Sequence, residues 1–93
     1  METFRAIVSG RVQGVNFRHN SAVRARDLGL KGYVRNMRSG DDVEVVAQGP
    51  REQLERYLDF LGAGPPAADV TNVDVRWGEG QDEGPFHSFS VRR

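Results

Sequence analysis

An arginine and an asparagine in this chain each stand at the end of a short stretch that could do chemistry. Arg18 closes GRVQGVNFR, residues 10–18, and Asn36 closes GYVRN, residues 32–36. A guanidinium offers a planar fork of donors that matches two phosphate oxygens. A carboxamide has one acceptor oxygen and two donor hydrogens, so it can hold a water molecule in a fixed orientation without changing its charge. These residue types could therefore bind a phosphate group and orient a water molecule.

The stretch before Arg18 leads from an expected strand into an expected helix. A helix N-terminus has amides without intrahelical partners and carries the positive end of the helix dipole, which favours anions. Gly10 and Gly14 would let the backbone approach a ligand, and the amides of residues 13–17 could form a concave nest. Neither the Walker sequence nor the dinucleotide-binding glycine spacing is present. The stretch is thus either an anion site or a plain strand-to-helix turn.

Asn36 is open to two interpretations in the same way. It stands at the end of an expected strand, next to an expected hairpin turn over RSGD, residues 38–41. If the strand before Gly10 joins the same sheet, the carboxamide of Asn36 could lie near residues 11–18. Alternatively, Asn36 only ends its strand.

The surrounding pattern predicts the elements that must position these residues. Alternating residues 3–10 are typical of a half-buried strand, and β-rich runs follow at residues 31–37, 41–49, 70–77 and 87–93. Helices are expected from residue 18 to a stop at Gly29 and over residues 50–64, where Leu54, Tyr57, Leu58 and Leu61 form an apolar stripe. The order β-α-β-β-α-β with a C-terminal strand predicts an α+β fold of the ferredoxin-like, split βαβ type. Two helices would cover one face of an antiparallel sheet.

Composition narrows the possible functions. The 93 residues suffice for a single domain, 1–93, and no cysteine is available for disulfides or thiolate chemistry. Thirteen basic and 13 acidic residues balance, which argues against a nucleic-acid partner. No apolar run has the length of a membrane span or a signal-peptide core, so we expect a cytoplasmic monomer with no membrane partner. His19 and His87 are isolated histidines without spaced ligands, and we expect no bound metal.

The two stretches together resemble the paired signature motifs of the acylphosphatase family. The matching residues are Gly10, Val12, Gln13, Gly14, Val15, Phe17 and Arg18 in the first motif, and Gly32, Tyr33, Val34, Arg35 and Asn36 in the second. VEVVAQGP at 43–50, GPPAADV at 64–70 and FSVRR at 89–93 also look like family sequences, so the resemblance covers nearly the whole chain.

This resemblance implies hydrolysis of small-molecule acyl phosphates to a carboxylate and inorganic phosphate, without metal, cofactor or covalent intermediate. Gln13, Gly14, Val15, Asn16, Phe17 and Arg18 would bind the substrate phosphate, with Arg18 as a catalytic clamp. Asn36, the second catalytic residue, would orient the attacking water. The alternative is a non-catalytic module of the same fold that binds phosphate or acyl phosphate in a regulatory or accessory role.

The chain departs from the family pattern at the expected hairpin. Gly40, Asp41 and Asp42 precede Val43, which makes the tip one residue longer than usual in the family. Because side chains alternate along a strand, the turn must absorb this residue if Val43 and Val45 are to face the core. Asn36 lies before the insertion, so its position should be unaffected.

Overall fold

Alternating apolar residues of the first strand form the centre of the hydrophobic core. The structure is a computed structural model that describes residues 1–13, 16–65 and 68–92. Strand β1 spans Glu2–Arg11, and Phe4, Ala6 and Val8 are fully buried on one of its faces. The predicted alternation is therefore confirmed, and the strand extends one residue further at each end.

The remaining elements follow the predicted order. They are helix α1 (Phe17–Asp27), strands β2 (Lys31–Asn36) and β3 (Asp42–Gly49), helix α2 (Arg51–Ala63), strand β4 (Asp69–Trp77), the 3-10 helix η1 (Gln81–Glu83) and strand β5 (Phe89–Arg92). The short η1 turn lies within residues 78–85, which the sequence pattern predicts only as a loop.

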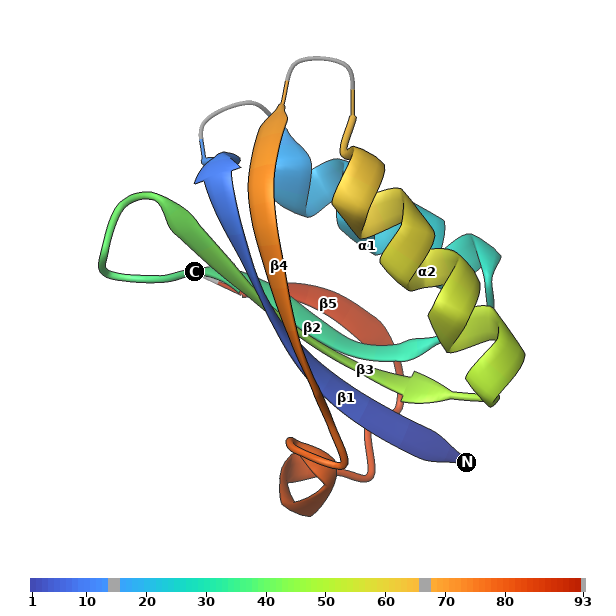
Figure 1. Cartoon of the computed structure of the whole chain (residues 1–93). Coiled ribbons are helices and arrows are strands. Elements are labelled where there is room, and N and C mark those ends of the chain that lie inside the picture. Colours follow the sequence, from blue (N-terminus) through green and yellow to red (C-terminus); the bar gives the residue numbers. More distant parts are fainter. Residues whose placement is uncertain (14–15, 66–67, 93) are drawn as a thin grey trace.

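The five strands form one sheet in the order β4-β1-β3-β2-β5, with both helices on the same face (Figure 1). The ferredoxin-like class is confirmed. One detail of the prediction needs correction, because β5 pairs with β2 in parallel and makes the sheet mixed rather than purely antiparallel. The connection from β2 to β5 passes through four other elements, so the two strands need not alternate in direction as hairpin neighbours do.

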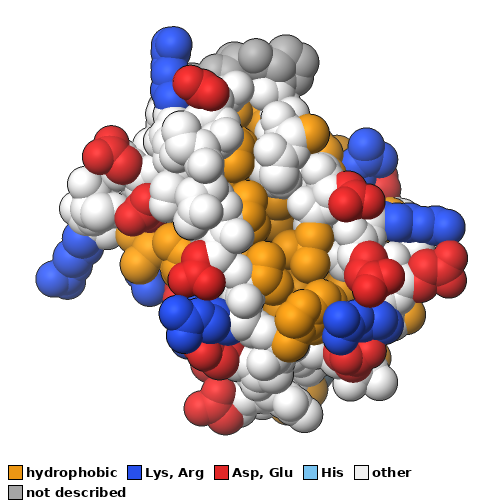
Figure 2. Space-filling model, viewed as in Figure 1, with side chains coloured by type: hydrophobic (Ala, Val, Ile, Leu, Met, Phe, Trp, Pro, Cys, Tyr) orange, Lys and Arg blue, Asp and Glu red, His pale blue; other side chains and the backbone are white. Residues whose placement is uncertain are grey.

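The two helices differ in the side chains that they bury. In α2 the predicted stripe is confirmed, with Leu54, Tyr57 and Leu61 fully buried and Leu58 half-buried. Helix α1 buries Phe17 and three small side chains, and its remaining surface is polar apart from the exposed Val23. Figure 2 shows apolar side chains exposed on the face seen in Figure 1, with charged groups around them. The half-buried residues Val73 and Val75 of the edge strand β4 pack against this core.

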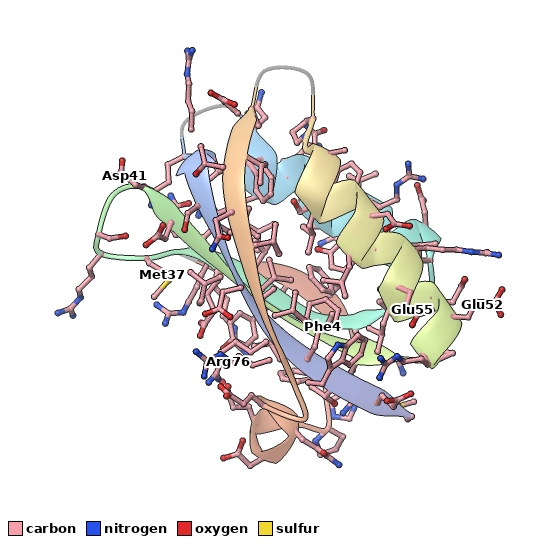
Figure 3. All side chains as sticks on the ribbon, in the orientation of Figure 1. Phe4, Met37, Asp41, Glu52, Glu55 and Arg76 are labelled. Atoms are coloured by element: carbon pink, nitrogen blue, oxygen red, sulfur yellow. The ribbon has the colours of Figure 1, made fainter. Side chains whose placement is uncertain are left out.

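Four segments meet at one end of the sheet. They are the end of β1, the start of α1, the hairpin between β2 and β3, and the C-terminal end of β5 (Figure 1). In Figure 3, Met37 and Asp41 lie on the two sides of that hairpin. Both expected functional residues, Arg18 and Asn36, belong to this end. None of the described helices is long and apolar enough to cross a membrane.

Candidate active site

Gly10 lies near the end of β1, beyond the last residue paired with β3 but still paired with β4, and the register between β1 and β4 shifts between Ser9 and Gly10. Gly10 has a φ of +125°, and a Cβ atom built there would lie 2.1 Å from the carbonyl oxygen of Asp69. This contact gives a reason for glycine at residue 10 that does not involve a ligand, and the expected approach of a ligand there stays a prediction. Gly10 lets the backbones of β1 and β4 come together at a bulge. Gly14 lies outside the described residues.

The N-terminus of α1 borders a pocket, and its first amides have no acceptor among the described residues. Asn16 precedes the helix in the left-handed conformation, with a φ of 60°, and its carbonyl accepts the first helical hydrogen bond, from Asn20. The amides of residues 17–19 therefore lack intrahelical acceptors. A pocket of about 230 Å³ is lined by Val12, Asn16, Phe17, Arg18, His19 and Val91. No carboxylate is among these described lining residues, so the site's fixed dipole and charge favour an anion.

The guanidinium of Arg18 is tethered to the last strand. Its Nη1 atom donates a hydrogen bond to the backbone oxygen of Arg92, at 2.9 Å. The parallel register of β2 and β5 places Arg92 beside Arg35, the residue just before Asn36. The side chain of Arg18 thus reaches from the helix to the level of the sheet at which Asn36 lies. It is half-buried and keeps other donor hydrogens for a ligand in the pocket.

Asn36 faces the same side of the sheet as the helices. It pairs with the buried Val43, and Val34, two residues earlier, is also buried in the core. Because side chains alternate along a strand, Asn36 shares this face. Its Oδ1 atom is buried and accepts no hydrogen bond from the described residues. Buried polar atoms normally have a partner, so this acceptor is suited to a bound water or ligand.

Gln13 connects the loop to the hairpin. Its Nε2 atom donates to the backbone oxygens of Asp42, at 2.8 Å, and of Met37, at 3.2 Å. The sequence indicated Gln13 as a phosphate-binding position through its backbone amide. The sequence did not predict this side-chain bridge, because a glutamine side chain can donate to any carbonyl that the fold brings near it. Val15, like Gly14, is a predicted phosphate-binding residue that lies outside the described residues.

The longer hairpin tip leaves the strands in register. Val43 and Val45 are both fully buried, and Asn36 still pairs directly with Val43. The amide of Met37 donates to the oxygen of Asp42 at 2.9 Å and thereby closes the turn. The turn has absorbed the additional residue, as expected.

Two residues of the second motif point away from the pocket, to the other face of the sheet. The hydroxyl of Tyr33 lies within hydrogen-bond distance of both Glu44 and Glu83, to either of which it can donate its one hydrogen, and Arg35 donates to Glu44 at 2.5 Å. Arg5 also contacts Glu44, which is only 6% exposed. Burial, with the hydrogen bond to Glu83 and the charge of Glu44, raises the pKa of Tyr33 to about 12. This network holds β1, β2 and β3 together and takes no part in lining the pocket.

The pocket also includes Val91, which sequence reasoning did not single out, and His19, which it set aside as an isolated histidine. Val91 contributes to the lining from β5, and the exposed His19 lies at its rim. Val91 and Arg92 reach the site only because β5 pairs with β2, and no local motif signals that pairing.

Comparison with known proteins gives this arrangement a family. The acylphosphatase family model matches residues 4–91. An acylphosphatase of Dehalococcoides mccartyi is 44% identical over 88 residues, which cover 94% of this chain and 97% of that protein. The crystal structure of acylphosphatase from Bacillus subtilis superposes with a TM-score of 0.91 at 34% identity, with all of both chains covered. The structure of HypF from T. kodakarensis matches with a TM-score of 0.84 and 28% identity over 100% of this chain but 12% of that one. The chain belongs to the acylphosphatase family, whose members are hydrolases acting on acid anhydrides.

Proposed function

We propose that this protein hydrolyses acyl phosphates with Arg18 and the helix α1 N-terminus as the phosphate site and Asn36 as the group that orients water. The reaction class follows from the family. The residue roles rest on the geometry of the chain's own side chains. The single observation that carries them is the buried, unpartnered Oδ1 of Asn36 at the same end of the sheet as the anion-favouring pocket.

Arg18 and backbone amides would bind the phosphate together. The free amides of the first helical turn and the guanidinium border one pocket. As the bond between phosphorus and the acyl oxygen lengthens, these donors would stabilise the charge on the equatorial phosphate oxygens. The predicted contributions of Gln13, Gly14, Val15, Asn16 and Phe17 are of this kind, through the backbone.

Asn36 would hold the nucleophile. Its buried Oδ1 can accept a hydrogen bond from a water molecule and so direct a lone pair of that water at phosphorus. The water oxygen forms the new bond to phosphorus, and the carboxylate leaves with the electron pair of the broken bond. A neutral amide cannot take up the proton, which we assign to a phosphate oxygen. A carboxylate is a good leaving group, so positioning and charge stabilisation must supply most of the rate.

The test is steady-state hydrolysis of benzoyl phosphate at neutral pH in EDTA. Arg18→Ala should lose on the order of 10³–10⁵ in rate, and Asn36→Ala on the order of 10²–10³. Arg38→Ala, which removes an exposed arginine of the nearby hairpin, is the matched control and should keep wild-type turnover. Circular dichroism checks that each variant folds.

The outcomes separate enzyme from binding module. Turnover that persists in EDTA and is lost only in the Arg18 and Asn36 variants supports the proposal. A folded Arg18 or Asn36 variant with most of its activity would refute that residue's role. A wild-type protein that binds phosphate without turnover would instead indicate the non-catalytic module of the same fold.

We further propose that the active form is a cytoplasmic monomer, that residues 1–93 form one domain, and that its partners are small-molecule acyl phosphates rather than nucleic acid or membrane. Sequence composition and pattern support these statements. Size-exclusion chromatography with light scattering tests the monomer, which predicts a mass near 10.4 kDa. A mass of twice that value would contradict it.

A further inference from the structure

The side chain of Gln13 forms a bridge between the two halves of the site. Both of its bonds end on backbone oxygens at the mouth of the hairpin: Met37, which directly follows Asn36, and Asp42, which lies opposite. The backbone amide of Met37 also donates to the backbone oxygen of Asp42. The side-chain amide of Gln13 therefore bonds to two residues that are already hydrogen-bonded to each other. Gln13 itself lies between Val12, which lines the pocket, and the loop that leads to α1.

Among the described residues, the other connections between the end of β1 and the hairpin are weaker or lie further from Asn36. The pairing of β1 with β3 ends at Ser9 and Asp42. Beyond it, the amide of Gly10 donates to the oxygen of Asp41 at a long 3.3 Å. The phosphate-binding segment begins after these bonds. Of the connections among the described residues, the bridge from Gln13 therefore lies nearest to the backbone that carries Asn36.

We propose that Gln13 is a positioning residue that holds the phosphate loop at the working distance from the water-orienting Asn36. This inference rests on the proposed function and adds to it a role for the side chain of Gln13, beside the role of its backbone amide. An error of about 1 Å in the placement of reacting groups can cost on the order of 10²-fold in rate. Two N–H donors from one neutral group match two carbonyl acceptors, and neither a carboxylate nor an apolar chain offers such donors.

Gln13→Met tests the proposal, because methionine keeps much of the length and packing but has no donor. We expect kcat for benzoyl phosphate to fall on the order of 10- to 100-fold. The inhibition constant of inorganic phosphate should change less than about twofold, since Arg18 and the helix amides remain. Gln13→Glu, with the same shape but a charge facing two carbonyl oxygens, should lose at least as much kcat.

A double-mutant cycle with Asn36→Ala distinguishes positioning from general damage. If Gln13 acts through the placement of water by Asn36, Gln13→Met should cost little further activity in the Asn36→Ala background. Gln53→Met is the matched control: the Nε2 of Gln53 also donates to a backbone oxygen, that of Leu28 at 3.3 Å, but far from the pocket. This control should keep wild-type kcat.

Several results would overturn the inference. Wild-type kcat in folded Gln13→Met or Gln13→Glu would do so, as would a parallel rise in the phosphate inhibition constant or full additivity with Asn36→Ala. If Gln13→Met fails to fold, Gln13→Glu is judged by the same criteria. The Asn36→Ala arm alone tests the proposed function, because its retention of activity would refute the role of Asn36 whatever Gln13 does.

Discussion

Replacing Gly10 with alanine should destabilise the protein far more than an ordinary glycine substitution. The new Cβ would lie 2.1 Å from the oxygen of Asp69 and 2.9 Å from the nitrogen of Thr71, both backbone atoms of β4. The φ of +125° alone costs an alanine about 2 kcal/mol. Pushing the strands apart adds about 2 kcal/mol more. The expected loss is about 4 kcal/mol, a large part of the 5–15 kcal/mol typical of a small domain.

Gly29→Ala is the matched control for this substitution. Gly29 also has a positive φ, +73°, but nothing lies within 4 Å of the Cβ that alanine would add. Its loss should be about 1 kcal/mol, from backbone conformation alone. Urea unfolding, followed through the fluorescence of the single tryptophan, Trp77, measures both variants. Equal losses in the two variants would refute the explanation by close strand approach.

Three further predictions concern buried polar groups away from the pocket. Glu44→Gln removes the buried carboxylate that pairs with the partly exposed Arg5 and Arg35, and it should lower the free energy of unfolding by about 2 kcal/mol. Urea titrations measure this loss, and a loss below about 1 kcal/mol would contradict the network. Tyr57→Phe should raise that free energy by about 1 kcal/mol, because the buried hydroxyl has no partner among the described residues, and a destabilised variant would show otherwise. The pKa of Tyr33 is raised to about 12 in the folded state, whereas it is near 10 in the unfolded chain. Between these two pH values the folded state keeps the phenolic proton that the unfolded chain loses. The free energy of unfolding should therefore fall as pH rises from about 10 to about 12. Urea midpoints across this range should show a smaller fall in Tyr33→Phe, and an equal fall would contradict the assignment.

Much of the fold could be predicted because its signals are local. The alternation of Phe4, Ala6 and Val8 and the stripe of Leu54, Tyr57 and Leu61 each encode a buried face within a few residues. The parallel position of β5 could not be predicted in this way. It depends on pairing with β2, which lies more than fifty residues earlier in the chain.

In the candidate site, too, local features could be predicted from the sequence and long-range contacts could not. Residue type and position made Arg18 and Asn36 candidates, and the resemblance to the acylphosphatase family implied their roles. The hydrogen bond from Arg18 to Arg92 joins residues 74 positions apart in the sequence. The bridge from Gln13 to the hairpin joins residues up to 29 positions apart. Only the folded chain brings these residues together. Gly10 could be identified from the sequence as a special position. The close approach of β4, which requires a glycine there, depends on tertiary structure and could not be predicted.

Equilibrium binding of inorganic phosphate to the wild-type protein, Arg18→Ala and Asn36→Ala, measured by calorimetry, tests the proposed division of roles most directly. The proposed roles predict that Asn36→Ala binds phosphate about as tightly as the wild-type protein, although it barely turns over, while Arg18→Ala loses phosphate affinity by at least about tenfold. Loss of phosphate binding in Asn36→Ala, or wild-type affinity in Arg18→Ala, would contradict the assignment of phosphate to Arg18 and of water to Asn36.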